Sequence, residues 1–278
     1  MKILFLGTGA SEGMPGLFCE CDLCAKARAL GGKNIRTRTS IHIDEKYKID
    51  LPPDTFLHVL RYNLHLADIE YLFITHSHSD HLCPSMLNYR KRPFILQEIK
   101  PLHIYGNQRV LSHIRDVLKF HGMDITSHPN FILHHARPFQ LIKSGRASVM
   151  PLPSDHSRLE VSLLYLFEVD GKTILHGYDS GWFLKETWKT LEDYTLDLVI
   201  LDCTNGGVSP DEMRGHMGIE GVLKTKEHMI SRGIANKDTI FVATHFAHGI
   251  GGLLHEQLES RLLPMNVQVA FDGLTIEL

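Results

Sequence analysis

The sequence has no long apolar run. No stretch among its 278 residues approaches the roughly 18 consecutive apolar residues that span a membrane. The N-terminal segment MKILFLGTGASEG has one lysine and a short apolar run before a Gly-Thr-Gly turn. This run is too short for the apolar region of a signal peptide. We therefore expect a cytoplasmic protein with no membrane partner.

An excess of positive charge is also missing. The 29 Lys and Arg residues are outnumbered by 32 Asp and Glu residues, for a formal net charge of −3. Domains that bind nucleic acid in general usually carry a basic surface. The small basic clusters at 36–38 and 90–92 are better interpreted as solvated surface. Nucleic acid is therefore not the expected partner.

Cysteine is scarce, and linker-like composition is absent. Thiols stay reduced in the cytoplasm, so the 5 cysteines are expected to be metal ligands, core residues or reactive thiols. The chain has no Pro/Gly/Ser-rich linker, repeat or low-complexity tract. Its 43% hydrophobic and 22% charged residues are ordinary for a globular protein. We predict one domain over residues 1–278.

Histidine, by contrast, is abundant, with 19 residues. The stretch 69–81, IEYLFITHSHSDH, combines the apolar run 71–74 of a buried strand with four potential metal ligands: His76, His78, Asp80 and His81. Imidazole and carboxylate groups suit Zn, Mn or Fe. One catalytic ion with an open site would not use all four, so two ions sharing the loop are favoured. The alternatives are a surface His-rich tract or a pH-sensitive turn.

Three further ionisable groups follow apolar strands in the same layout. His156 follows 149–152, Asp179 follows 172–176, and His245 follows 240–243. Each alone is a weak signal, but open α/β sheets place their sites at the carboxyl ends of strands. We therefore expect these groups to join the ligands of the 76–81 loop.

A second cluster, Cys19-Glu20-Cys21-Asp22-Leu23-Cys24, has C-x-C-x2-C spacing. Three thiolates and one histidine make a closed, tetrahedral zinc site. His248, three residues beyond His245, is the best candidate for the fourth ligand. Such a zinc would stabilise the fold and leave no position for chemistry. The alternative is a loop whose cysteines are incidental.

Strands and helices alternate along the whole chain. The sequence predicts strands at 2–6, 39–44, 46–50, 70–74, 101–105, 131–136, 138–142, 147–152, 160–169, 172–176, 196–202 and 239–243, followed by two short C-terminal strands. It predicts helices at 54–66, 82–92, 108–120, 182–192, 218–231 and 250–261. Asp170-Gly171 indicates a hairpin. Gly7-Thr8-Gly9 lacks the G-x-G-x-x-G spacing of a dinucleotide site. The pattern favours sheets packed against helices.

The motifs together resemble a known family. THSHSDH resembles the signature of the metallo-β-lactamase superfamily, and the Cys loop with THFAH at 244–248 resembles its PhnP-like phosphodiesterases. PSDHSRL at 153–159, VILDCTN at 199–205, the segment 216–223 and FDGLTIEL at 271–278 add to the resemblance. The resemblance implies an α+β fold with four αββα layers, in which two packed β-sheets lie between helices.

The resemblance also implies an allocation of ligands. It assigns His76, His78 and His156 to one ion, Asp80, His81 and His245 to the other, and Asp179 to a bridge between them. The two divalent ions would be Mn or Zn, and a separate structural zinc would bind Cys19, Cys21, Cys24 and His248.

Activity follows from the same resemblance. Such enzymes hydrolyse cyclic phosphodiesters, notably a ribosyl 1,2-cyclic phosphate. A bridging hydroxide would attack phosphorus, with Asp80 needed for turnover and His216 acting as general acid toward the leaving oxygen. Two divalent cations would carry four positive charges, of which two carboxylates and one hydroxide would offset three. The remaining positive charge favours a small anionic substrate.

Some features depart from the family, and two alternative functions stay open. Residues 50–54 replace the more usual Asp-Ala-Gly turn, and 82–135 is longer than in compact members, so the substrate is not fixed. The alternatives are a tRNA 3′-end processing nuclease, and a non-hydrolytic accessory protein similar to one of pyrroloquinoline-quinone biosynthesis. The oligomeric state is open, with a homodimer as one option. An apolar neighbour favours core packing for Cys83 and Cys203.

Overall fold

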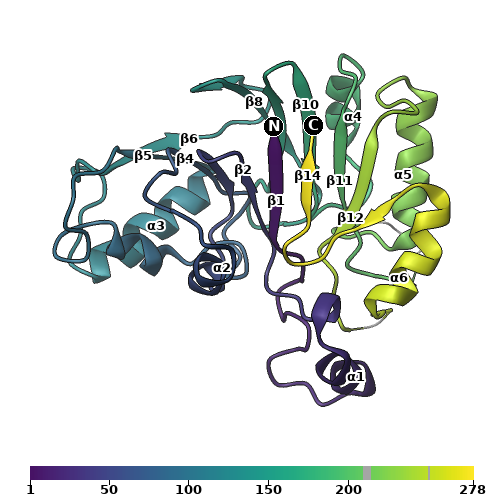
Figure 1. The fold of residues 1–278 in the computed structure, drawn as a ribbon. Coiled ribbons are helices and arrows are strands. Elements are labelled where there is room, and N and C mark those ends of the chain that lie inside the picture. Colours follow the sequence, from purple (N-terminus) through teal and green to yellow (C-terminus); the bar gives the residue numbers. More distant parts are fainter. Residues whose placement is uncertain (209–213, 250) are drawn as a thin grey trace.

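The computed structural model describes residues 1–208, 214–249 and 251–278. Its strands form two seven-stranded sheets, which lie between outer helices (Figure 1). In spatial order, the first sheet contains β14 (Thr275–Glu277), β1 (Lys2–Gly7), β2 (Ser40–Ile43), β3 (Tyr47–Ile49), β4 (Tyr71–Phe73), β5 (Leu102–Gly106) and β6 (Phe131–His135). The second contains β13 (Gln268–Val269), β12 (Ile240–Thr244), β11 (Leu198–Asp202), β10 (Lys172–Gly177), β9 (Leu163–Val169), β8 (Ala147–Pro153) and β7 (Ile142–Ser144).

The two sheets enclose the central core. Alternate residues of each strand point inward, as the period of two in a strand requires. Phe73 of β4 packs edge-on against Tyr165 and Phe167 of β9, with ring centroids 5.3 and 5.1 Å apart. All three side chains are fully buried. These contacts hold the first sheet against the second.

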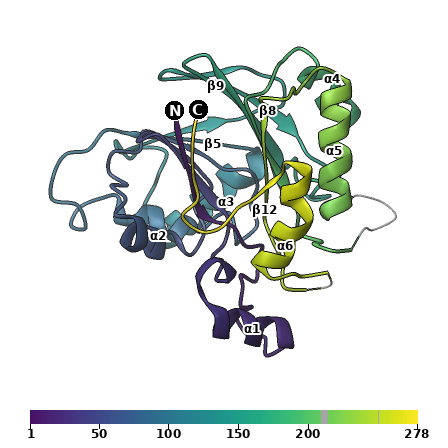
Figure 2. The same cartoon turned by 45° about the vertical axis from the view of Figure 1, so that its right-hand side comes forward.

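Helices cover the outer face of each sheet. The first sheet is covered by α2 (Thr55–Tyr62), α3 (Gln108–Phe120) and the 3₁₀ helix η2 (Pro84–Tyr89), and the second by α4 (Lys185–Leu191), α5 (Ile219–Ser231) and α6 (His255–Leu262) (Figure 2). Leu72 and Ile104 share a buried cluster with Ile114 of α3. Val199 and Val222 share another on the far side. The predicted αββα layering is confirmed.

The chain order of the predicted elements is largely confirmed. Asp170 and Gly171 both have positive φ, 51° and 77°, in the hairpin that joins β9 to β10. This is the geometry of a type I′ turn, which asparagine, aspartate and glycine adopt most readily. The apolar stretch 196–202 forms β11, which lies between two parallel neighbours and is buried along its length.

Several predicted elements are wrong or displaced. The strand predicted at 138–142 begins only at Ile142, because Pro138 has no N–H to donate and Phe139 has a positive φ of 62°. The helix predicted at 82–92 is the shorter η2, and the one predicted at 250–261 is α6, with residue 250 outside the described residues. Helix α1 (Asp22–Leu30) was not predicted, since its short segment has little apolar periodicity.

Within the described ranges, every helix is too short or too polar to cross a membrane.

Strands β3 to β6 run parallel, as do β10 to β13. Their carboxyl ends therefore lie at one edge of each sheet. Most of the ionisable groups named above follow these ends.

Candidate active site

The loop after β4 turns back on itself within a few residues. The His81 and Leu82 amides donate to the His78 carbonyl, at 3.1 and 3.0 Å. The turn places His76 and His81 in the interior, with 0% and 1% exposure, while His78 faces outward. Three imidazoles and the Asp80 carboxylate are therefore gathered on one short loop.

The second sheet brings the remaining ligands to this loop. His156 follows β8, Asp179 follows β10, and His245 follows β12. The structure thus brings all seven predicted residues together, in three overlapping groups whose ligand atoms lie within 4.8 Å of one another: His76, His78, His156; Asp80, His81, His245; and His76, His81, Asp179. The first two groups have the membership that the resemblance implied, and Asp179 lies between them.

Individual distances show how closely the groups face one another. His76 Nε2 lies 2.8 Å from His78 Nδ1, which is 3.2 Å from His156 Nε2. On the other side, His81 Nε2 lies 3.2 Å from an Asp80 oxygen. The two Asp179 oxygens lie 2.7 Å from His81 Nε2 and 3.3 Å from His245 Nε2.

Each buried imidazole is oriented by a partner on its other nitrogen. His81 Nδ1–H donates to Asp50 at 2.7 Å, and His245 Nδ1–H donates to the Thr204 hydroxyl at 2.8 Å. His76 Nδ1–H donates to the Thr75 hydroxyl at 3.0 Å, and Thr75 in turn donates to Asp50. Such partners fix the tautomer and leave Nε2 free for a metal ion.

The residues present fit a pair of divalent ions. Among the described residues, the buried atoms His81 Nε2, His245 Nε2 and both Asp179 carboxylate oxygens have no hydrogen-bond partner. Buried polar atoms are normally satisfied, so a group of orphans aimed at one point indicates a ligand there. Five imidazoles and two carboxylates are a suitable donor set for Zn or Mn.

The carboxylates and two of the imidazoles have the protonation states of metal ligands. Burial lowers the pKa of His76 and of His156, so both rings are neutral ligands at pH 7. Burial on its own would raise the pKa of Asp179, but the neighbouring His245 and His81 lower it well below its usual value. Burial alone would also raise the pKa of Asp80, but His81 and His245 lower it well below its usual value. Both carboxylates are therefore anionic. His81 differs: burial would lower its pKa, but Asp179, Asp80 and Asp50 raise it well above its usual value, so an ion at His81 Nε2 would have to displace a proton.

Three residues of the site have left-handed backbones. Asp50, Asp179 and His245 have φ values of 61°, 53° and 62°. Such conformations are uncommon for residues other than glycine and persist where the surrounding structure enforces them. Asp50 and His245 directly follow β3 and β12, and Asp179 lies two residues after the end of β10. At each of these positions the left-handed backbone turns the chain out of the strand, so that the side chain points toward the other residues of the site.

His216 lies at the rim of the cluster. Its ring is stacked 5.6 Å from that of His245, and its Nδ1–H donates to Asp202 at 2.9 Å. The His216 side chain is 29% exposed, whereas Asp202 is fully buried. Burial opposes protonation, but the Asp202 charge outweighs it and raises the pKa of His216 to about 9.

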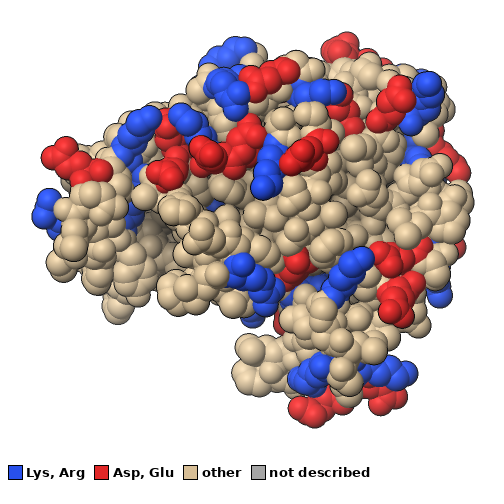
Figure 3. All heavy atoms as spheres, in the orientation of Figure 1, with Lys and Arg blue, Asp and Glu red and all other residues tan. Residues whose placement is uncertain are grey.

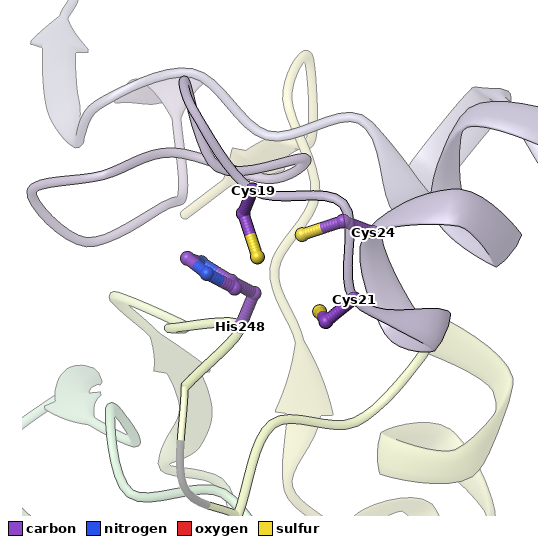
Figure 4. Close-up of side chains that lie close together, drawn as sticks. All are labelled: Cys19, Cys21, Cys24 and His248. Carbon is purple, nitrogen blue, oxygen red and sulfur yellow. The ribbon is translucent and has the colours of Figure 1, made fainter.

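The predicted zinc ligands also lie together. Cys19, Cys21 and Cys24 surround one point with His248, and the four ligand atoms lie within 4.8 Å of one another (Figure 4). Helix α1 begins between the second and third cysteines. The backbone at Gly16 packs tightly against His248. A Cβ at this position would lie only 2.4 Å from the His248 ring, so a larger residue would displace the ring. The arrangement fits a closed tetrahedral zinc site.

This cysteine loop is anchored to the strand that supplies His245. The Phe246 amide donates to the Thr8 carbonyl at 2.9 Å, and the Ala10 amide donates to the Phe246 carbonyl at 3.0 Å. The backbone just before the cysteines is thereby joined to the end of β12. A metal ion bound by the thiols would fix the position of this strand end.

Two residues of the site were not predicted. Asp50 accepts hydrogen bonds from His81 and Thr75, and Asp202 accepts them from His216 and the Asp179 amide. Each lies at the end of a strand, the layout used to find Asp179, and that signal was available for both. Cys203 is fully buried in the core, as predicted, whereas Cys83 is only half-buried and its thiol lies 3.3 Å from Ser85 Oγ.

The histidines of the long segment 82–135 stay outside the site. His103 Nδ1 lies 2.9 Å from His134 Nε2 and their rings stack, while His121 and His135 are exposed. All six histidines of this segment are exposed or half-buried, and none belongs to the ligand clusters among the described residues.

Known structures share this fold over nearly their whole length. A diphosphatase of the PhnP family is 22% identical, with a TM-score of 0.75, and the match covers 100% of this chain and 97% of that one. Zn²⁺-bound PqqB from Methylobacterium extorquens is 16% identical, with a TM-score of 0.77 and full coverage of both chains. The short form of human tRNase Z is 19% identical, with a TM-score of 0.67 and coverage of 100% and 99%.

Sequence comparison gives the family. An octanoyltransferase of Porphyromonas gingivalis (strain ATCC BAA-308 / W83) is 26% identical over 280 residues, which cover 99% of this chain. The chain spans only 51% of that relative's length. Residues 50–246 match the family model described as the beta-lactamase superfamily domain. This match covers well over half of the chain and contains the complete set of seven clustered ligands. The chain belongs to the metallo-β-lactamase superfamily, whose fold it has.

Proposed function

We propose that this protein is a phosphodiesterase that uses two divalent ions, Mn or Zn, to hydrolyse a small cyclic phosphodiester similar to a ribosyl 1,2-cyclic phosphate. The observation that carries the proposal is the convergence of seven potential ligands in two groups of three, with Asp179 close to His76 of the first group and to His81 and His245 of the second. The similarity of fold to a PhnP-family diphosphatase supports it.

Two ions in such a site activate water near neutral pH and neutralise the oxygens of a phosphoester during in-line displacement. The chain's own residues hold and orient the site. Asp50 and Thr204 keep His81 and His245 in the tautomer that presents Nε2. The two carboxylates only partly offset the charge of two divalent ions, which favours an anionic substrate.

His216 is suited to protonate the leaving oxygen. Its Nδ1–H is occupied by Asp202, so Nε2 is the ring nitrogen free to donate toward substrate. Asp202 also stabilises the protonated ring, in the way that a carboxylate orients and supports a general acid. A general acid of this kind contributes about 10²–10⁴-fold to the rate.

The proposal can be tested with bis(p-nitrophenyl) phosphate and the metal-reconstituted protein. Asp80→Ala should abolish turnover, with the circular dichroism spectrum unchanged. Asp116→Ala is the matched control, because Asp116 is exposed on α3, away from the site. Wild-type activity in the Asp80→Ala variant would refute the proposal. A screen of cyclic phosphates would then identify the substrate.

Metal content separates this proposal from the alternatives. We expect three ions per chain, two in the His/Asp site and one structural zinc. One ion per chain would favour a non-hydrolytic accessory protein. Tight, salt-sensitive binding of tRNA would favour a tRNA 3′-end nuclease. The face shown in Figure 3 has Lys and Arg interspersed with Asp and Glu, which does not favour a nucleic-acid surface.

A further inference from the structure

A large cavity lies over the outer face of the first sheet, away from the metal ligands. It has a volume of about 660 Å³ and lies between α2, η2 and the chain that leads into β5. Most of its lining is apolar, including Leu51, Val59, Ile69, Leu72, Leu87 and Leu102. Figure 3 shows a hollow beside the position of α2, surrounded largely by uncharged residues. Small-molecule sites have this size and character.

The charged residues that line this cavity are both cations, Lys48 and Arg90. Lys48 belongs to β3, whose Tyr47 and Ile49 point into the core between the sheets. Lys48 therefore points to the outer face, beneath α2, where an apolar residue would be usual. Its side chain is only 1% exposed.

The Lys48 ammonium contacts only neutral acceptors. Nζ donates to the Asp50 carbonyl at 2.6 Å and to the Ser40 hydroxyl. Among the described residues, these two uncharged oxygens are the hydrogen-bond acceptors of Nζ. An ammonium has three N–H donors, so one remains for another acceptor. Burial lowers the pKa of Lys48 to about 7, against the opposing effect of Asp50.

Arg90 is only half-buried, but it too contacts neutral acceptors. Its guanidinium donates to the Leu66 and Lys100 carbonyls at 3.2 and 2.8 Å, and its buried Nε has no partner among the described residues. Buried charges are normally paired with an opposite charge. Two cations in an apolar cavity whose lining contains no carboxylate therefore indicate that the counter-charge arrives with a ligand.

We propose that this cavity binds a medium-chain aliphatic carboxylate, with its hydrocarbon tail along the apolar lining and its carboxylate against Lys48 Nζ. A single anionic group on an apolar body matches both the lining and the charge. The proposal does not depend on the phosphodiesterase activity, because no ligand of the metal centre lines this cavity.

The cavity is nevertheless joined to the metal loop. Leu51, which forms part of its wall, donates its amide to the His81 carbonyl at 2.8 Å and accepts from the Cys83 amide at 2.7 Å. Lys48 holds the carbonyl of Asp50, whose carboxylate orients His81. The cavity wall is therefore hydrogen-bonded to the loop that carries four of the seven proposed metal ligands.

The test is isothermal titration of the full chain with decanoate, 1-decanol and decyltrimethylammonium, which share one tail and differ in the head group. Decanoate should bind one per chain and more tightly than the other two. Lys48→Met should weaken decanoate binding about tenfold or more, the value of a charge-assisted hydrogen bond, and leave decanol unchanged. Lys46→Met is the matched control, since Lys46 is in the same hairpin but exposed.

A second variant covers the case in which Lys48→Met does not fold. Ala67 is exposed at the cavity lining, so Ala67→Trp should fill the opening and abolish binding of both decanoate and decanol. Absence of decanoate binding to the wild type would overturn the proposal. So would equal binding of decanoate and decanol that neither variant changes. The proposal would also be contradicted if the protein cosedimented with phosphatidylglycerol vesicles but did not bind free decanoate. The site would then bind a lipid surface and not a single carboxylate.

Discussion

Replacement of Asp50 by asparagine tests how the metal site is built. The Asp50 carboxylate is fully buried, and Oδ1 accepts from the Thr75 amide and hydroxyl at 2.8 and 3.0 Å. Oδ2 accepts from His81 Nδ1–H at 2.7 Å. In Asp50→Asn the Thr75 contacts can be kept by the amide oxygen. The amide nitrogen would then face His81, and it can only donate.

His81 must therefore change its tautomer. Its Nδ1 would accept from the asparagine, and the proton would move to Nε2, the atom that faces Asp80 and Asp179. A protonated Nε2 cannot bind a metal ion. Loss of such a supporting contact typically costs 10–100-fold in metal affinity, equivalent to about 1.4–2.7 kcal/mol.

Competition with a chromophoric chelator measures this loss directly. We expect Asp50→Asn to release one ion of the pair at zinc concentrations that saturate the wild type, with the thiol-bound zinc retained. Asp54→Asn is the matched control, because Asp54 pairs with Arg38, outside the metal site. A folded Asp50→Asn protein with wild-type affinity for all its ions would show that this tautomer argument is incorrect.

Three further predictions follow from the structure. His216→Gln should lower kcat by about 10²–10⁴-fold while elemental analysis shows unchanged metal content; a loss of metal would instead make His216 a ligand. Cys24→Ser should reduce the metal content by one ion per chain and lower the melting temperature, with a control in the half-buried Cys83→Ser, which should do neither. Burial lowers the pKa of His58 to about 3, from an ordinary value near 6.5. The unfolded chain therefore binds the proton first, and stability falls as the pH drops from 6.5 toward 3, by about 2 kcal/mol at pH 5. Urea unfolding at pH 7 and 5 should show a smaller loss in His58→Gln, and an identical loss in both proteins would contradict this account.

The clustering of the seven proposed metal ligands was predictable because each has a local signal. THSHSDH is dense in donors, and His156, Asp179 and His245 each follow an apolar strand. The order of the strands was predictable for a similar reason, since apolar runs such as that of β11 have few other interpretations.

What the sequence did not reveal depends on contacts between distant segments. Asp202 supports His216 across the end of a sheet, and Asp50 supports His81 from a neighbouring strand. In the sequence, Lys48 alternates with Tyr47 and Ile49, a pattern typical of a strand whose polar face meets water. Only packing of α2 over that face buries the lysine. Helix α1 was missed because few apolar positions mark its face.

The placement of the ligands on both sheets has a consequence for folding. His76, His78, Asp80 and His81 come from the first sheet, whereas His156, Asp179 and His245 come from the second. Neither half of the chain alone holds a full coordination shell for two ions, so two bound ions would act as a clamp across the layers. Free metal at a thousand times its dissociation constant adds about 4 kcal/mol to stability. Cells grown in metal-poor medium should therefore accumulate a chain whose two halves separate more easily and are cut sooner by proteases.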